Sequence, residues 1–345
     1  MSKKHYIIPI FISHSGCPHQ CVFCNQDKIA RSLIKEVTGE EVRETVEEHL
    51  KTIDKNNSLI EISFFGGTFT AINRKKQKEY LAVAKEYKEK GLIHKIRMST
   101  RPDAISEEIL NYLKEFTVDI IELGVQSLDN TVLKLSGRGH TAQDVEIASK
   151  LIKDSGITLG HQIMPGLPGS DYNKDIKSAM DSIKMKPDIC RIYPSLVIKE
   201  TPMEQMYYKG VYNPYTVDEA IEVSKEIYKL YKAAGVNIIR VGLQPTDTIT
   251  LGKDVVAGPF HPAFRELVEG SLIIDSIKNS TKDEEDLLIE VNPKDISKLY
   301  ANKKLYFNQF SKGRKGKILV NQTSKVKRGS LNIKIIEKEL KLAII

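Results

Sequence analysis

The sequence contains few cysteines, no tryptophan and no long apolar run. Its four cysteines are too few and too clustered for a secreted disulfide framework, and such clusters more often bind metal or act in catalysis. No apolar stretch approaches the roughly 20 residues that a membrane-spanning helix needs. Residues 1–16 lack the small-residue cleavage site of a secretory signal. We therefore expect a cytoplasmic protein with no membrane partner. The absence of tryptophan excludes nothing.

The positive charge is concentrated at the carboxyl end of an otherwise ordinary globular composition. The 345 residues are 41% hydrophobic and 28% charged, enough for one large α/β domain and a smaller one. Residues 303–345 contain twelve Lys or Arg and two Glu, a local net charge of +10, whereas the whole chain carries +7. This basic region predicts a polyanionic partner, nucleic acid first. A solvated lysine-rich surface is the alternative.

Short β-branched runs alternate with amphipathic helical stretches as far as residue 195. Alternation at about 30-residue spacing predicts parallel strands with crossover helices, in either a partial barrel or a doubly wound sheet. The expected strands cover 6–13, 59–67, 94–100, 118–127, 157–164 and 188–195. The expected helices cover 38–55, 74–90, 106–115, 141–154 and 171–184. In both folds the working face lies where strands end.

The second half of the chain is less regular. A tyrosine-rich segment at 201–220 precedes a long helix that reaches about residue 234 and a strand-like stretch at 236–244. Beyond a polar stretch at 279–286, short strand-like runs predict a small α+β appendix. We therefore divide the chain into a core at 1–200, an extension at 201–278 and a small basic C-terminal region at 279–345.

Three of the four cysteines follow the first strand directly, in the stretch "GCPHQCVFC". Their spacing is C-x3-C-x2-C: Cys17, Cys21 and Cys24. Three thiolates on one loop can hold three irons of a 4Fe–4S cluster, which leaves the fourth iron open to a ligand from outside the protein. A structural zinc site completed by His14 or His19 is the alternative, but it fits poorly without a second cysteine pair. Cys190 lies inside an apolar strand and is expected to be an ordinary buried thiol.

This spacing resembles the signature of the radical S-adenosylmethionine (SAM) superfamily. In that family the open iron binds SAM, and reductive cleavage of SAM yields a 5′-deoxyadenosyl radical. The resemblance implies a 4Fe–4S cluster, SAM as cofactor and an external electron donor. It also implies an α/β fold, a partial (β/α)6 barrel of radical SAM type with the small α+β appendix at its C-terminal end. Phe23, the aromatic residue before the last cysteine, would then pack near the adenine.

Two further loops are expected to bind SAM, the first by resemblance to this family and the second by its chemistry. Gly66, Gly67 and Thr68 resemble its "GGEP"-type motif, with Thr in place of the usual Glu, and glycines permit close backbone approach. Ser99 and Arg101, in "STRPD", are polar at the end of a buried strand, so we expect them to face a cavity. Arg101 is suited to pair with the SAM carboxylate. A surface salt bridge is the alternative for this arginine.

The stretch "LGVQSLDNTVLKLSGRGHT" (123–141) resembles oxygen-independent coproporphyrinogen dehydrogenases and the Elongator catalytic-subunit family. By that resemblance, Gln126 would hydrogen-bond the SAM ribose, and Arg138 would contact the SAM carboxylate or ribose. In "HQIMPGLPGSD" (161–171), the backbone of Gly166 and Leu167 would pass the adenine edge.

Residues 193–223 resemble the Elongator family closely, and the whole resemblance covers about residues 6–270. That family acts on tRNA wobble uridines and carries an acetyltransferase domain. Only about 75 residues follow position 270, too few for that domain, so we expect a separate acyltransferase partner. Four tyrosines and two lysines of this segment either stack unpaired bases or pack a helix onto the barrel: Tyr207, Tyr208, Tyr212, Tyr215, Lys199 and Lys209.

These patterns lead to one main hypothesis and two alternatives. The main hypothesis is a radical SAM enzyme that modifies a tRNA or other RNA base, with the basic C-terminal region binding the RNA. The first alternative is a coproporphyrinogen dehydrogenase-like activity on a small molecule. The second is a non-catalytic, metal-containing RNA-binding protein.

Overall fold

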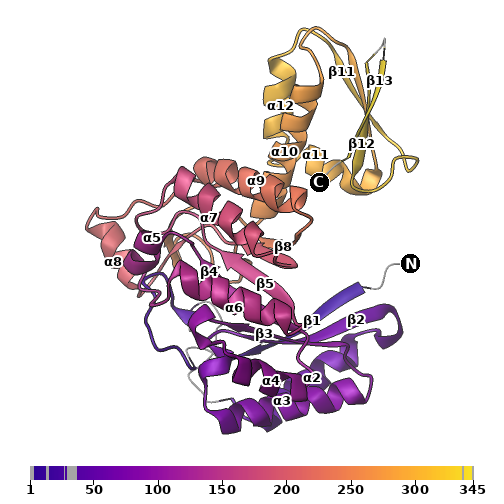
Figure 1. Cartoon of the computed structure of the whole chain (residues 1–345). Helices are drawn as coiled ribbons and strands as arrows, with labels where there is room; N and C mark the ends of the chain where they lie inside the picture. Colours follow the sequence, from indigo (N-terminus) through magenta and orange to yellow (C-terminus); the bar gives the residue numbers. More distant parts are fainter. Residues whose placement is uncertain (1–3, 13–14, 27, 29–36, 336–337, 344–345) are drawn as a thin grey trace.

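The computed structural model describes residues 4–12, 15–26, 28, 37–335 and 338–343. Within these residues, parallel strands form one seven-stranded sheet that curls into a half-barrel (Figure 1). Its strands, in spatial order, are β1 (Lys4–Phe11), β2 (Ser58–Phe65), β3 (Lys95–Thr100), β4 (Ile120–Gln126), β5 (Thr158–Ile163), β6 (Ile189–Ile192) and β8 (Asn237–Val241). Because the spatial order follows the chain order throughout, the partial barrel is confirmed and the doubly wound sheet is excluded.

All six predicted strands are present, and the structure adds a seventh. The stretch 236–244 forms β8, which pairs in parallel with β6 through Ile189 and Asn237. The sequence indicated a strand here but gave no sign that it continues the sheet, because a long irregular segment separates it from β6. A short strand in that segment, β7 (Val197–Ile198), pairs with another short strand that follows β8, β9 (Val255–Ala257).

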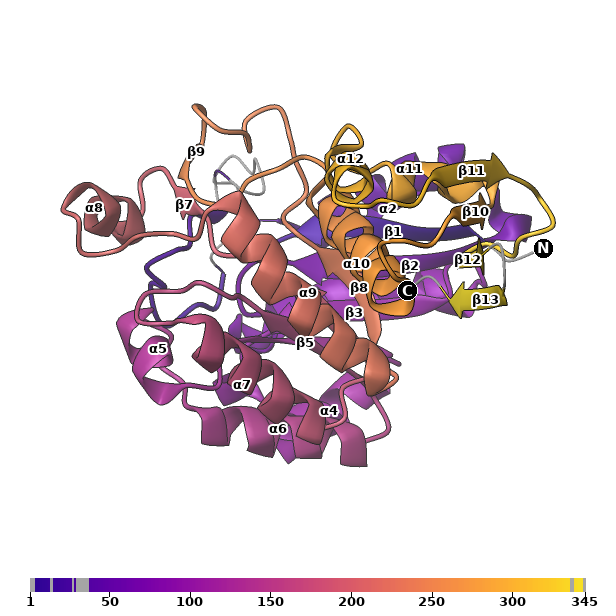
Figure 2. The ribbon, with the colours of Figure 1, turned by 90° about the horizontal axis from the view of Figure 1, so that it is seen from above.

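Helices cover the outer face of the half-barrel, and α7 and α9 pack side by side (Figure 2). The boundaries of the five predicted helices agree with the observed ones to within three residues. The starts agree best because side-chain caps mark them in the sequence; Thr38 and Glu41, for example, form a capping box. The short helices α5 and α8 and the long helix α10 were not predicted from the sequence. The helices are α2 (Gly39–Thr52), α3 (Arg74–Glu89), α4 (Glu107–Glu115), α5 (Asn130–Leu135), α6 (Ala142–Asp154), α7 (Tyr172–Lys184), α8 (Pro202–Tyr208), α9 (Val217–Ala233) and α10 (Phe264–Ser280).

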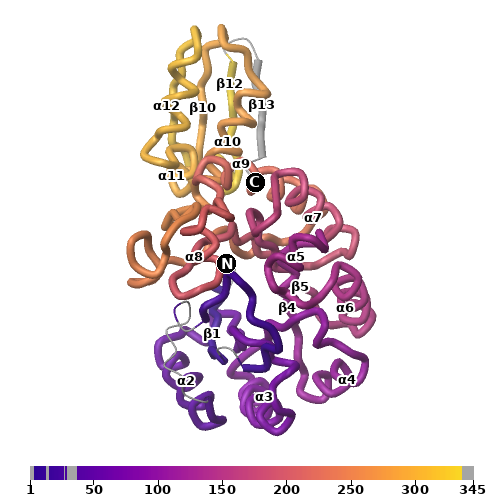
Figure 3. The backbone as a smooth tube through the Cα atoms, turned by 90° about the vertical axis from the view of Figure 1, so that its left-hand side faces the viewer, coloured from indigo at the N-terminus to yellow at the C-terminus, as the bar shows by residue number. Residues whose placement is uncertain are grey.

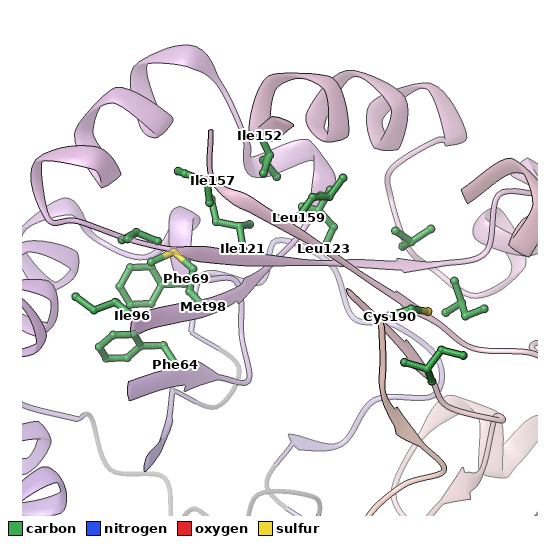
Figure 4. Close-up of a cluster of buried hydrophobic side chains, with 14 of the residues drawn as sticks. Phe64, Phe69, Ile96, Met98, Ile121, Leu123, Ile152, Ile157, Leu159 and Cys190 are labelled. Carbon is green, nitrogen blue, oxygen red and sulfur yellow. The ribbon is translucent and has the colours of Figure 1, made fainter. Parts of the chain in front are cut away.

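The main core lies between the sheet and these helices (Figure 4). Alternate strand residues such as Phe64, Met98 and Leu123 are fully buried there, together with Ile152 of α6. Since side chains alternate along a strand, the residues between them point to the opposite, concave face of the half-barrel. That concave face carries the polar residues described below.

The C-terminal part projects beyond the half-barrel as a separate sheet (Figure 3). Its four described strands lie in the order β11-β10-β12-β13, and its inner face packs on α10, α11 and α12. The small α+β appendix is therefore confirmed. No helix in the described ranges is both long and apolar enough to cross a membrane. The new elements are β10 (Leu287–Val291), α11 (Ile296–Leu299), α12 (Leu305–Lys312), β11 (Ile318–Gln322), β12 (Ser330–Ile335) and β13 (Lys338–Ala343).

Candidate radical SAM site

The cysteine loop, residues 15–26, follows β1 at the carboxyl edge of the sheet and is shaped by the loop after β2. The backbone N–H of Thr68 donates to the Ser15 carbonyl at 2.7 Å, and Cys17 Sγ lies 3.4 Å from Thr68 Oγ1. Gly66 and Gly67 have φ of +74° and +57°. A Cβ on Gly67 would lie 2.3 Å from the Ser15 carbonyl oxygen, so only glycine permits this contact. The glycine motif thus fixes the start of the cysteine loop.

A second glycine-rich loop, residues 136–140, holds the other side of the cysteine loop. The N–H of Val22 donates to the Ser136 carbonyl at 3.1 Å. Gly139 has φ of +72°, and a Cβ there would lie 2.2 Å from the ring of His19. The cysteine loop is therefore held between two loops that the sequence separates by about 70 residues. His14, the other histidine of the zinc alternative, lies outside the described residues.

Arg138 and Arg101 form a chain of contacts that ends on a cysteine. Arg138 donates from Nη1 to Cys21 Sγ at 3.1 Å and from Nη2 to the Gly124 carbonyl at 2.6 Å. Arg101 donates to the Arg138 carbonyl and pairs with both carboxylate oxygens of Asp103, at 2.9 and 3.0 Å. Both arginines are buried. Arg101 already has a carboxylate partner in this structure, and the roles expected for both toward SAM stay predictions.

Gln126 ends β4 in an unusual backbone conformation. Its φ is +66°, its side chain is buried, and the pairing register with β5 shifts between Gly124 and Gln126. Gln162 on β5 donates from Nε2 to Gln126 Oε1 at 3.3 Å, so both amides lie on the concave face. Ser99, half-buried on β3, also lies at this end of the sheet. Left-handed backbone at a non-glycine residue costs of order 1–3 kcal/mol and clusters at functional sites.

Phe23, Gly166 and Leu167 lie together beneath α8. Phe23 and Leu167 belong to one apolar cluster. Gly166 uses its own backbone groups inside the protein: its N–H donates to Asp175 at 2.9 Å, and its carbonyl accepts from the Tyr212 hydroxyl at 2.6 Å. Burial raises the pKa of Asp175 to about 6. The loop 164–170 is thus rigidly held, while the adenine contacts expected of Gly166 and Leu167 stay predictions.

Sequence reasoning missed a row of buried charges across the concave face, which we call the charged row: Glu61, Arg97, Glu122 and Arg191. Arg97 pairs with Glu61 at 2.7 Å and with Glu122 at 2.9 Å. Arg191 donates to Glu122 at 3.1 Å and to the Tyr193 hydroxyl at 3.0 Å. All four residues are buried. The available signal was one charged residue within each apolar strand run.

Two buried histidines, His140 and His161, are held neutral. Burial lowers the pKa of His140 to about 3, and the positive charges of Arg138 and Arg101 lower it further. His161 is fully buried on the helical side of β5, where Ser149 and Ser182 hydrogen-bond its two ring nitrogens. Its pKa also falls to about 3 through burial. His161 is therefore structural.

The cysteine loop supplies three free thiols, the donor set that a 4Fe–4S cluster with one open iron requires. In the part of the chain that the structure describes, no three Cys, His, Asp or Glu side chains gather tightly enough to hold one ion. A 4Fe–4S cluster instead binds each thiolate to a different iron. Burial and the neighbouring Cys21 raise the pKa of Cys24 to about 12, so a metal that bound this sulfur would displace the thiol proton to solvent. Cys190 lies in the core, away from this loop (Figure 4).

Family comparisons agree with this geometry. The model of the radical SAM superfamily matches residues 11–183, half of the chain, from the end of β1 to α7. The chain belongs to the radical SAM superfamily. The radical SAM C-terminal domain matches residues 187–273, which include β6, β8 and α9.

Similarity to individual proteins places this radical SAM chain near the Elongator catalytic subunits, as expected. It is 32% identical over 256 residues to the tRNA uridine(34) acetyltransferase of Methanocaldococcus infernus, covering 63% of this chain and 48% of that protein. It is 28% identical over 203 residues to Elongator complex protein 3 of Bos taurus, covering 53% and 37%. The solved structure of M. infernus Elp3 with an N-terminal deletion superposes with a TM-score of 0.64 at 26% identity, covering 81% and 65%. The chain spans about half the length, or less, of these two curated relatives.

Proposed function

We propose that this radical SAM enzyme binds a 4Fe–4S cluster through Cys17, Cys21 and Cys24 and modifies a base of tRNA or another RNA. The observation that carries the proposal is the three-thiol loop held between two glycine-rich loops, with the fourth cysteine buried elsewhere. When bound, the cluster supplies the electron that cleaves SAM to a 5′-deoxyadenosyl radical. The electron donor and the acyltransferase are separate proteins in this proposal, and the enzyme is cytoplasmic.

The surrounding residues would bind and orient SAM. The backbone of Gly66, Gly67 and Thr68 can approach a ligand closely, because no side chain intervenes at the two glycines. Gln126 offers a donor and an acceptor to a ribose diol at the end of β4. Arg138 offers a guanidinium to a carboxylate beside the cysteines. Five other residues complete the proposed SAM site: Phe23, Ser99, Arg101, Gly166 and Leu167. Arg101 also donates to the Arg138 carbonyl.

An RNA substrate is supported by the relatives' names and by two surfaces of this chain. Tyr208 of α8 is 70% exposed, with its ring 5.6 Å from that of Tyr207, and offers an aromatic face on which a base could stack. Tyr212 and Tyr215 instead donate their hydroxyls to Gly166 and Asp175. The basic C-terminal region adds exposed lysines. We propose that residues 1–200 carry the chemistry, 201–278 extend the substrate surface and 279–345 bind RNA.

Serine variants of the cysteines test the cluster directly. We expect each of Cys17→Ser, Cys21→Ser and Cys24→Ser to lose most bound iron and to reduce 5′-deoxyadenosine formation to background under dithionite. Cys190→Ser is the matched control and should retain iron, because Cys190 lies in the core. The measurements are iron content after anaerobic reconstitution and chromatography of SAM products. A triple cysteine variant that still cleaves SAM would end the proposal.

The substrate is tested by mass spectrometry of tRNA nucleosides. Comparison of a strain lacking the protein with its parent should show one modified nucleoside lost, and reconstituted enzyme should restore that nucleoside on the isolated RNA. An unchanged nucleoside profile, together with active SAM cleavage, would remove RNA as the substrate while leaving the radical chemistry in place.

A further inference from the structure

The four residues of the charged row have no net charge. The next strand of the sheet, β8, adds a further cation, Arg240. Glu61 and Glu122 balance Arg97 and Arg191. On β8, Arg240 is the register partner of Arg191. Residues paired in register on parallel strands share a face, so two arginines lie side by side at this edge of the half-barrel. Like charges placed opposite one another on a sheet are destabilising.

Arg240 has no acidic partner within the described part of the chain. It forms no ion pair there and is half-buried. Its neighbour Arg191 is already engaged by Glu122 and Tyr193. A half-buried, uncompensated arginine beside another arginine costs stability in the free protein, and a bound anion would offset that cost.

Arg240 lines a cavity of about 500 Å³ between β8, the start of α10 and α11. The other two cations in the lining, Arg265 and Lys298, both pair with Glu269, at 2.8 and 3.2 Å. Glu266 also lines the cavity, so the lining carries a net charge of +1. The cavity includes residues 241–245, just after β8, and therefore lies on the same rim of the sheet as the cysteine loop.

The lining offers both a phosphate ligand and apolar surface. A guanidinium binds phosphate oxygens through two parallel hydrogen bonds. Ile239, Leu243 and Pro245 add apolar surface beside it. Cavities of 300–1,000 Å³ are typical of small-molecule sites. A phosphate joined to a nucleoside matches this combination better than a bare inorganic anion does.

We propose that this cavity is a nucleotide-phosphate site, with Arg240 as the residue that binds the phosphate. Two sources of this chemistry exist: a phosphodiester of an RNA strand that enters the half-barrel across its β8 edge, and a free nucleotide. The RNA source rests on the proposed function, whereas the site itself does not.

The test measures binding to a fluorescent uridine-containing RNA hairpin, and separately to uridine 5′-monophosphate, at several salt concentrations. In Arg240→Gln we expect three- to tenfold weaker RNA binding and a log–log salt slope smaller by about 0.7–0.9, the value for one phosphate contact. Arg240→Lys should restore the slope. Arg74→Gln, on the outer helix α3, removes the same charge elsewhere and should change neither quantity.

The possible results decide separately whether the Arg240 cavity binds a phosphate and whether the substrate is RNA. Arg240→Gln should still fold and cleave SAM, and its thermal unfolding temperature should rise, because the like-charge pair is gone. If the hairpin does not bind but uridine 5′-monophosphate binds and is lost in Arg240→Gln, the site stands with a free nucleotide, and the RNA substrate falls. If Arg240→Gln leaves affinity and slope unchanged for both probes, or if neither probe binds the unmodified protein, the site is wrong.

Discussion

The seven-stranded half-barrel and the four-stranded C-terminal sheet differ in how deeply their ion pairs are buried. On the half-barrel, Glu122 is 3% exposed and is bonded by two arginines. On the C-terminal sheet, Glu290 meets a single partner, Lys334, at 3.3 Å, and the lysine side chain is 42% exposed. Both sheets carry ion pairs, but only the first removes them from water.

The position of each buried charge therefore matters for stability, whereas for the exposed charges only their total number matters. A buried ion must be matched by partners in good geometry, because its desolvation is otherwise uncompensated. An exposed pair contributes 0–1 kcal/mol, and its position can change without consequence. We therefore expect the stability of the half-barrel to depend on individual charged residues. The exposed charges of the C-terminal sheet should act mainly through their total, which affects RNA binding.

Of the variants considered, Glu122→Gln should lower the free energy of unfolding the most. The substitution leaves Arg97 and Arg191 buried around a neutral amide, and removing one partner of a buried ion pair costs about 3–5 kcal/mol. Urea unfolding should show this loss in the free energy of unfolding. Glu290→Gln, the matched change on the C-terminal sheet, should cost less than about 1 kcal/mol. Equal losses in the two variants would contradict the distinction between the sheets.

The sequence predicted most of the half-barrel because local signals and tertiary structure agree there. Strand runs bounded by glycine and proline, together with helix caps such as Thr38 with Glu41, placed six strands and five helices. β8 was placed outside the six units because its partner β6 is about 45 residues away in the sequence. No local pattern records such a pairing.

The site was predictable where its residues form short motifs, and unpredictable where they meet across strands. The cysteine, glycine and "GRGH" stretches are each continuous, and the structure brings all three together. The charged row has one member per strand, so each member looks like an isolated charge. The contact of Arg138 with Cys21 spans 117 positions and follows only from the fold.

Asp175 should give the half-barrel a specific pH dependence. Its folded-state pKa, raised to about 6 by burial, exceeds the unfolded value of about 3.9, so the folded state binds the proton more tightly. Its contribution is therefore fully present below about pH 4 and is lost as the pH rises through 6. The loss amounts to about 3 kcal/mol, from about two pKa units at 1.36 kcal/mol each.

Comparison with Asp175→Asn isolates this contribution from those of other groups. Asparagine does not titrate, so the difference in unfolding free energy between the two proteins should change between pH 4 and 7 and stay constant above pH 7. Urea unfolding at several pH values measures it. Parallel curves for the two proteins across this range would show that Asp175 does not titrate as proposed.

The smallest effect on stability is expected at the exposed lysines of the basic region. Lys325 and Lys327 are exposed in the loop between β11 and β12. The side chain of Arg314, by contrast, is 1% exposed and donates to Thr281 Oγ1 and the Glu285 carbonyl. The double variant Lys325→Gln, Lys327→Gln should change the unfolding free energy by less than about 0.5 kcal/mol. It should lower the salt slope of RNA binding by about 1.5, because two phosphate contacts are lost.

The variant Arg314→Gln tests whether a buried cation of the basic region acts differently from its exposed lysines. The sequence counts Arg314 among the same twelve cations, but its contacts fix the turn before β10, so its loss should destabilise the C-terminal sheet and leave the salt slope nearly unchanged. Thermal unfolding and salt-dependent RNA titrations on the full chain separate the two effects. If all three cations lower the slope equally, the region binds by charge count alone; if none does, the RNA surface lies elsewhere.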